Sequence, residues 1–447
     1  MSDFLEQLFC ANKIKDFVTR FKEAEEKYGS QEEFLKEVAV YLPVRLYEHH
    51  YDGTVPHSFF GLMSASLLAQ SLFPEEGRWR PLVQQCWFAT KETKRTPLNL
   101  DDIEAHSEGS VEERWQHFQE AADGESFQEA MAWAKSFFDK EEDRLFFREQ
   151  SLGYALNDTF QGGHKFLYLF QAWRLAEALN WTHLEKIISP ALHFLVVGPR
   201  DHSLSLFVLK HWHQDSLASF LKNKGGISTQ RYHEVEEALL FGEGQQDALK
   251  VLQSLAESGV SLEAVQETLL LAASQALSNS QLGEWIWPMR AFHFIYCIQQ
   301  WPDQKPEQKS YSLLLAAALL QQASIRSREL EQNRQLDEVA RQLCPIEPLS
   351  VLRSVISHTD PYASATAIYA ILGMDDTKKE ELFEILSSLA VKNDGDQCYG
   401  HDILFIHEVV DCYKRLQHEQ KDKLLVSAGF FLGRVAKKYE LFGTYKG

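Results

Sequence analysis

The chain has 447 residues, of which 45% are apolar and 24% charged, and its formal net charge is −19. This composition is ordinary for a folded soluble protein with a large core. The acidic balance argues against nucleic-acid or anionic-membrane binding, because both need clustered Lys and Arg. Charged residues interrupt every apolar run before the ~18 residues that a membrane span needs, so we expect no transmembrane segment.

The N-terminus and the cysteines favour a cytoplasmic location. Asp3 and Glu6 stand where a signal peptide would be basic, so the first residues are expected to form an amphipathic helix. The six cysteines are scattered and form no CxxC pair. That distribution favours reduced thiols over a disulfide framework or a structural zinc site.

Helical periodicity dominates the chain in sequence order. Apolar positions recur at helical spacing over 3–28, and Ser30 with Glu33 predicts a capping box before the next apolar stretch. The further expected helices cover 57–72, 110–139, 141–156, 164–180, 183–196, 202–222, 229–241, 245–258, 261–278, 280–300, 309–334, 347–357, 361–373, 376–391, 401–417 and 420–439.

The sequence predicts an all-α protein. Alternating β-branched segments with Asn-Gly or Asp-Gly turns are nearly absent, so little or no β-sheet is expected. Residues 1–447 are expected to form a single large helical body with a central cavity, with loop breaks near 94–110 and 302–309. No repeat period of a helical solenoid is convincing.

A histidine recurs at the start of apolar helices. In five places a turn-like approach, often with Pro or Gly, leads to a histidine and then to several large apolar residues: His57, His164, His202, His293 and His401. Side chains in the first turns of helices that pack side by side can point into one cavity. Neutral imidazoles are good ligands for Fe, Zn, Cu or Ni, and a positive helix end disfavours the imidazolium form. The alternative is that each histidine is a core residue hydrogen-bonded to a carbonyl.

Other polar groups give weaker signals. Glu48, His49, His50 and Asp52 form a dense cluster that either extends a metal site or lies in a solvated loop. His401–Asp402 is an HD pair of the kind that metal-dependent phosphohydrolases use. Asp158, Asp402 and Glu408 are candidates for orienting the ligating imidazoles. No GxGxxG, Walker A or GxSxG motif is present, so no nucleotide cofactor is indicated.

Several of these segments resemble the questin oxidase-like family. They are HHYDGTVPHSFFGLMSASLL, FQGGHKFLYLFQAWRLAEAL, RDHSLSLFVLKHW and, near the C-terminus, GHDILFIHE. The resemblance implies an all-helical oxygenase with a non-haem iron site of several histidines and a carboxylated lysine, acting on anthraquinone-type polyketides. The residues that match family histidines are His57, His164, His202, His293 and His401. Leu404 stands at the family's lysine position and cannot be carboxylated, so the metal would be held differently, be another metal or be absent.

Three functions follow from these observations. The first is a non-haem, Fe(II)-dependent oxygenase that acts on an aromatic or polyketide-like small molecule, with O₂ at an open coordination position and aromatic side chains around the substrate. The second is a helical binding or scaffold protein without chemistry, whose histidines are structural. The third, supported only by the HD pair and nearby acidic residues, is a metal-dependent hydrolase.

Overall fold

The computed structural model describes residues 2–46, 57–73, 77–92, 99–212, 222–281, 283–301, 304–328, 348–373, 376–394, 398, 400–435 and 440–445. In the N-terminal half the helices are α1 (Ser2–Phe9), α2 (Ile14–Tyr28), α3 (Gln31–Tyr41), the 3₁₀ helix η1 (Pro43–Arg45), α4 (His57–Leu72), α5 (Arg80–Glu92), α6 (Val111–Asp123), α7 (Phe127–Lys135), α8 (Glu141–Leu156), α9 (His164–Ala178), α10 (Leu184–Val197) and α11 (Ser203–His211).

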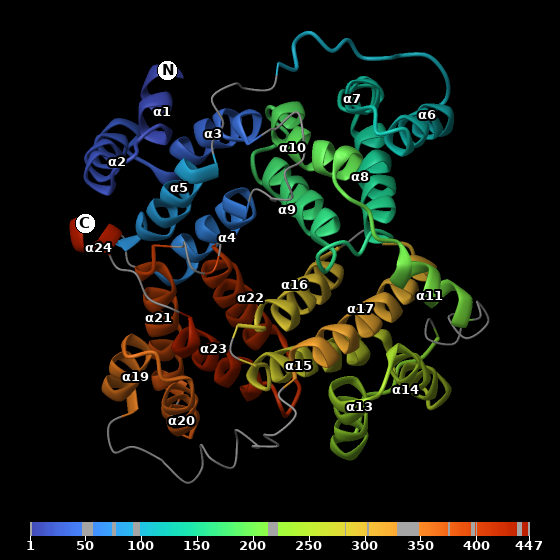
Figure 1. The fold of residues 1–447 in the computed structure, drawn as a ribbon, viewed down its shortest axis with the longest axis vertical. Coiled ribbons are helices and arrows are strands. Elements are labelled where there is room, and N and C mark those ends of the chain that lie inside the picture. The colour runs from blue at the N-terminus through green and yellow to red at the C-terminus, as the bar shows by residue number, and fades with distance from the viewer. Residues whose placement is uncertain are drawn as a thin grey trace.

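The C-terminal half continues in the same way. Its helices are α13 (Thr229–Phe241), α14 (Gln245–Glu257), α15 (Leu262–Ser278), α16 (Ile286–Gln300), α17 (Pro306–Ser327), α19 (Pro348–Ser357), α20 (Pro361–Leu372), α21 (Asp376–Lys392), α22 (His401–Arg415), α23 (Asp422–Arg434) and α24 (Glu440–Thr444). The described residues contain no β-strand, only two isolated bridges. The all-α prediction is therefore confirmed for this part of the chain (Figure 1).

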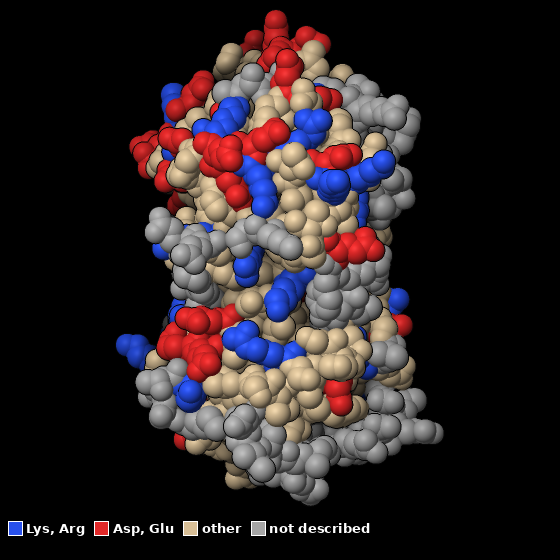
Figure 2. Space-filling view, turned by 90° about the vertical axis from the view of Figure 1, so that its left-hand side faces the viewer, with Lys and Arg blue, Asp and Glu red and all other residues tan. Residues whose placement is uncertain are grey.

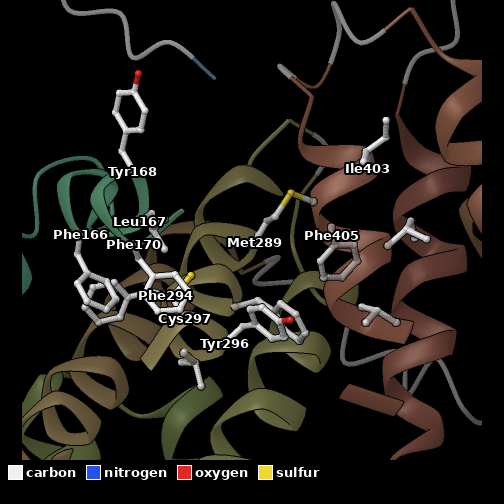
Figure 3. Close-up of a cluster of buried hydrophobic side chains, with 14 of the residues drawn as sticks. Phe166, Leu167, Tyr168, Phe170, Met289, Phe294, Tyr296, Cys297, Ile403 and Phe405 are labelled. Carbon is white, nitrogen blue, oxygen red and sulfur yellow. The ribbon is translucent and has the colours of Figure 1, made fainter. Parts of the chain in front are cut away.

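The middle of the molecule is occupied by α4, α9, α16 and α22 (Figure 1). Helix α4 packs against α5, α9 and α22, while α16 packs against α9 and α22 as well as α15 and α17. Phe166 of α9 and Phe294 of α16 meet edge to face with 5.3 Å between ring centroids. Figure 3 shows this aromatic contact, with Phe405 of α22 on the other side of α16. One continuous buried apolar cluster extends from Leu5 to Tyr445.

Helix boundaries differ from the sequence prediction where the chain turns. The expected helix 3–28 is divided into α1 and α2, and the expected helix 110–139 is divided at Gly124, the C-cap of α6. In the described residues, α11 ends at His211, although the periodicity predicted a helix to 222. The Ser30 hydroxyl does accept a hydrogen bond from the Glu33 amide, as the capping motif predicts.

Helix α5 is missing from the sequence prediction. Its residues from Pro81 to Ala89 are all buried, including the polar Gln84 and Gln85. A helix that is covered on all sides shows no apolar stripe, so the 3.6-residue period that marks a surface helix is absent.

The expected loop break near 94–110 is irregular over its described residues, 99–110. It is nevertheless attached to the helical body, because the Lys135 ammonium donates to the carbonyls of Leu100 and Ile103 at 2.7 and 2.6 Å. At the second expected break, 302–309, α17 already begins at Pro306.

The surface carries charges of both signs. On the face in Figure 2, acidic and basic side chains alternate over the described residues and leave no continuous basic field there. None of the helices in the described part of the chain combines the length and the apolar character that crossing a bilayer requires.

A buried ion pair fixes α9 in this arrangement. The Lys165 ammonium lies 2.7 Å from the Asp158 carboxylate, and their side chains are 0% and 4% exposed. Lys165 also donates to the carbonyls of Leu195 and Gly198, near the end of α10. Burial lowers the pKa of Lys165, and the neighbouring Asp158 carboxylate opposes this shift.

Removing one partner of this pair should be costly. We expect Lys165→Met to lower the free energy of unfolding by about 3–5 kcal/mol, because the Asp158 charge then stays buried without its partner. Urea denaturation measures this loss. In the Lys165→Met background, Asp158→Asn should restore part of it, and a double variant no more stable than the single one would contradict this account.

Candidate metal centre

Two glycines form the turn that places His164. Gly162 and Gly163 have φ values of +79° and +82°, a region that suits glycine, and α9 begins at the next residue. A Cβ atom on Gly163 would come within 2.5 Å of the Phe294 ring. The glycines therefore let the chain reverse against α16 and bring the first residue of α9 into the core, where the His164 side chain is fully buried.

His401 and His57 occupy the same position in their own helices. Gly400, with φ of +75°, is the N-cap of α22, and His401 is the first residue of that helix. His57 is the first residue of α4 and is partly exposed. The backbone amides of His57 and Ser58 each donate at 2.8 Å to the Glu92 carboxylate, which holds this helix end against α5.

The three helix starts converge on one point. A ring nitrogen of each of His57, His164 and His401 lies within 4.8 Å of a ring nitrogen of the other two. The Nε2 atoms of His57 and His164 are 3.3 Å apart. Two imidazoles bound to one tetrahedral ion through bonds of about 2.0–2.1 Å have their nitrogens roughly 3.3–3.4 Å apart. The spacing of this pair fits a shared metal ion.

Burial keeps the imidazoles of His164 and His401 neutral. The pKa of His164 lies well below its usual value because of burial first, and then because of the positive charge of Arg290. The pKa of His401 is likewise lowered by burial first and then by His293. The His164 Nδ1 lies 2.7 Å from the Gln161 carbonyl, so its N–H is at Nδ1 and its Nε2 lone pair is directed at His57. Neutral imidazole with a free lone pair is the form that binds metals.

His293 lies beside the centre but not at a helix start. Helix α16 begins before Pro288, which a first turn can accommodate, so His293 lies about two turns inside the helix. Its Nδ1 is 2.5 Å from the Glu408 carboxylate and its Nε2 is 3.1 Å from Nδ1 of His401. The sequence pattern therefore selected a histidine that does lie near the site, but His293 is not at the start of its helix as the pattern predicted.

His202 stays outside the group. It is the N-cap of α11, its side chain is exposed, and its Nδ1 is 3.0 Å from the Asn157 carbonyl. The sequence pattern is the same as at His164, but α11 packs against α14 and α17 rather than beside α4 and α22. The geometry does not support His202 as a ligand of this centre.

Of the three acidic candidates, Glu408 contacts His293, which lies beside the centre. The Asp158 carboxylate pairs with Lys165 and accepts from the amides of Phe160 and Asp201. The Asp402 carboxylate accepts from Gln84 at 3.3 Å. Asp402 is not in the group of ligand atoms that His401 forms with His57 and His164 among the described residues. The cluster Glu48, His49, His50 and Asp52 lies outside the described residues.

A small cavity adjoins the centre. Its accessible volume is ≈ 10 Å³, which is about room for one water molecule. Its lining comprises His164, Leu167, Gln171, His293, Cys297, His401, Leu404 and Glu408. The expected cavity is thus present beside the histidines, but it is too small for an aromatic ring. Leu404, at the position where the family resemblance has lysine, forms part of its wall.

Sequence reasoning missed Gln171 as a wall of this cavity. Gln171 follows His164 by seven residues, as Glu408 follows His401 by seven, and this spacing returns to the same helix face after two turns. Its Oε1, like the Glu408 Oε1 and the His401 Nε2, is buried without a hydrogen-bond partner in the described structure. Applying the helical period from each histidine would have found both residues.

Comparison of the chain with family models, with curated proteins and with solved structures finds no match. The resemblance to the questin oxidase-like family therefore remains a prediction from the motifs.

The glycine turn can be tested directly. We expect Gly163→Ala to destabilise the protein by at least roughly 1–2 kcal/mol, because φ of +82° strains an L-residue and the added methyl group collides with Phe294. Thermal unfolding of the variant beside Gly226→Ala, where a Cβ meets open space, measures the effect. Equal melting temperatures for the two variants would contradict this reading of the turn.

The ligand set gives a second prediction. If the three histidines bind one metal ion, His57→Ala, His164→Ala and His401→Ala should each weaken Zn²⁺ or Co²⁺ binding by at least about 100-fold, since each variant removes one of the three candidate ligands among the described residues. His202→Ala, which alters the same sequence pattern at an exposed site, should bind as the wild type does. Isothermal titration calorimetry after chelator treatment gives the comparison. Retention of wild-type affinity by any of the first three variants would remove that residue from the set.

Proposed function

We propose that the protein is a non-haem metal-dependent oxidoreductase whose centre consists of His57, His164 and His401. The convergence of these three imidazoles, with a ring nitrogen of each within 4.8 Å of the others, supports the proposal most strongly. Three histidines leave coordination positions open for substrate and co-substrate, as catalytic metal sites do. Fe(II) is the metal we expect, because it is the ion that the resemblance implies.

The cavity has the size and the partly apolar wall that suit O₂. Leu167, Cys297 and Leu404 form the apolar part of its wall beside His164 and His401. Its volume suits a diatomic molecule or one water, so an organic substrate would have to bind outside it. Bound Fe(II) would supply the one-electron chemistry with O₂. The protein would hold the ligands and limit the water at the centre.

The organic substrate would approach from the side of His57. His57 is partly exposed, whereas His164 and His401 are buried, so this side alone is open among the three ligands. An aromatic or polyketide-like small molecule remains the proposed substrate class, on the strength of the motif resemblance. We place the reaction in the cytoplasm, since Cys86, Cys297 and Cys412 are buried free thiols.

The other two functions, a metal-dependent hydrolase and a scaffold without chemistry, require different features of the histidine site. A metal-dependent hydrolase of the HD type would use Asp402 as a ligand, and Asp402 is not in the group of ligand atoms that His57, His164 and His401 form among the described residues. A scaffold without chemistry would bind no metal. Its histidines would be satisfied by internal hydrogen bonds alone, yet the buried Nε2 of His401 has no partner among the described residues.

Metal content and oxygen reactivity test the proposal together. Tag-free protein purified without oxygen should contain about one iron per chain, and His164→Ala should contain almost none. Addition of nitric oxide to the iron-loaded protein should give the electron paramagnetic resonance signal of a non-haem Fe–NO adduct, and aromatic polyketides should increase oxygen uptake. Zinc that binds tightly with no oxygen uptake would favour hydrolysis. No bound metal in any preparation would favour the scaffold.

A further inference from the structure

Three buried side chains form a line behind the candidate centre. The Glu408 carboxylate contacts His293 Nδ1 at 2.5 Å, and His293 Nε2 contacts His401 Nδ1 at 3.1 Å. Their exposed fractions are 0%, 1% and 3% respectively. His401 Nε2, on the far side of the ring, is the nitrogen without a partner in the described structure.

The protons in such a line can be arranged in two directions. If Glu408 is ionised, His293 donates from Nδ1 to the carboxylate and accepts at Nε2 from His401, whose own N–H is then at Nδ1. The His401 Nε2 atom is left with a lone pair. If Glu408 carries the proton, each donor becomes an acceptor and His401 Nε2 carries hydrogen. A metal ion can bind only the first arrangement.

We propose that Glu408 and His293 are positioning residues for His401, and that His293 is not itself a metal ligand. The inference rests on the metal centre proposed above. Both ring nitrogens of His293 are already engaged, one by Glu408 and one by His401. The chain holds His401 in the tautomer that directs a lone pair at His57 and His164, and it places one negative charge behind the centre.

The two buried histidines of the proposed centre, His164 and His401, differ in the group that accepts a hydrogen bond from Nδ1. His164 donates from Nδ1 to a neutral backbone carbonyl, that of Gln161. His401 donates to an imidazole that is in turn bound to a carboxylate. Hydrogen bonds that end on an ion are stronger than those between neutral groups, and they raise the basicity of the imidazole. His401 is therefore the stronger electron donor of the two buried ligands.

Co²⁺ binding to the full chain tests this assignment. We would measure affinity by chelator competition and record the visible Co²⁺ spectrum for Glu408→Gln, Glu408→Leu, His293→Gln and His293→Leu. Tyr296→Phe is the matched control, since it removes a nearby hydrogen bond to Asp411 outside the line. His401→Ala is the reference for loss of a true ligand.

Glutamine keeps an acceptor oxygen at either position, whereas leucine removes it. The leucine variants should bind Co²⁺ roughly 10–100-fold more weakly than wild type, and the glutamine variants less than about 10-fold more weakly. All four should keep the wild-type band intensities, because the ligands are unchanged. Loss of binding in His293→Gln equal to that in His401→Ala, with an altered spectrum, would make His293 a ligand. Wild-type affinity in both leucine variants would overturn the positioning role.

A second measurement reads the tautomer without relying on affinity. In Zn²⁺-loaded protein with ¹⁵N-labelled histidine, the His401 ring should carry its proton at Nδ1, with the resonances assigned by their absence in His401→Ala. A proton at Nε2 would overturn the proposal. Because the Gln variants preserve the hydrogen-bonding shape, thermal melts can confirm that they are folded. If wild-type protein binds neither Co²⁺ nor Zn²⁺, the metal centre itself fails, and that outcome is distinct from a failure of the line behind it.

Discussion

The arrangement depends on one constraint, which is that three buried helices begin at the same place and each begins with histidine. An α-helix directs its first side chains and its positive dipole end to the same point. Because α4, α9 and α22 start at one point, their first residues, His57, His164 and His401, lie close together. The glycines before α9 and α22 are needed for this geometry, since each chain segment must reverse sharply to enter its helix from within the core.

The converging helix ends bring positive charge to one point, and nearby acidic side chains offset it. Three positive helix ends and the nearby Arg290 all oppose a cation at the proposed centre. Glu92 accepts from the amides at the start of α4, and buried Glu408 lies behind His401 and His293. Burial raises the pKa of Glu408, while His293 lowers it. A bound dication would strengthen the ionised form of this carboxylate, so metal binding and the charge of Glu408 support one another.

The sequence predicted the fold class and the positions of the converging histidines unequally well. The pattern of turn, histidine and apolar run identified His57, His164 and His401, because each is the first residue of an apolar helix. The same pattern at His202 precedes a helix whose neighbours leave its first turn exposed. At His293 the proline lies inside the helix rather than before it. Local sequence does not report which helices pack together, so neither difference was visible in it. The helix α5 was missed because it is buried on all sides and so shows no apolar stripe in its sequence.

Leu404 connects the motif resemblance to the geometry. In the resemblance a carboxylated lysine at this position would bring negative charge directly to the metal. Here an apolar side chain lines the cavity instead, and no such ligand is available from it. Glu408 follows Leu404 by four residues, one turn further along the same face of α22, and it reaches His401 through His293. In the proposed centre the negative charge would come from Glu408, which lies behind a ligand, rather than from a ligand itself. The apolar Leu404 side chain in the wall helps to keep the cavity small, and three histidine ligands would leave coordination positions open for substrate and O₂.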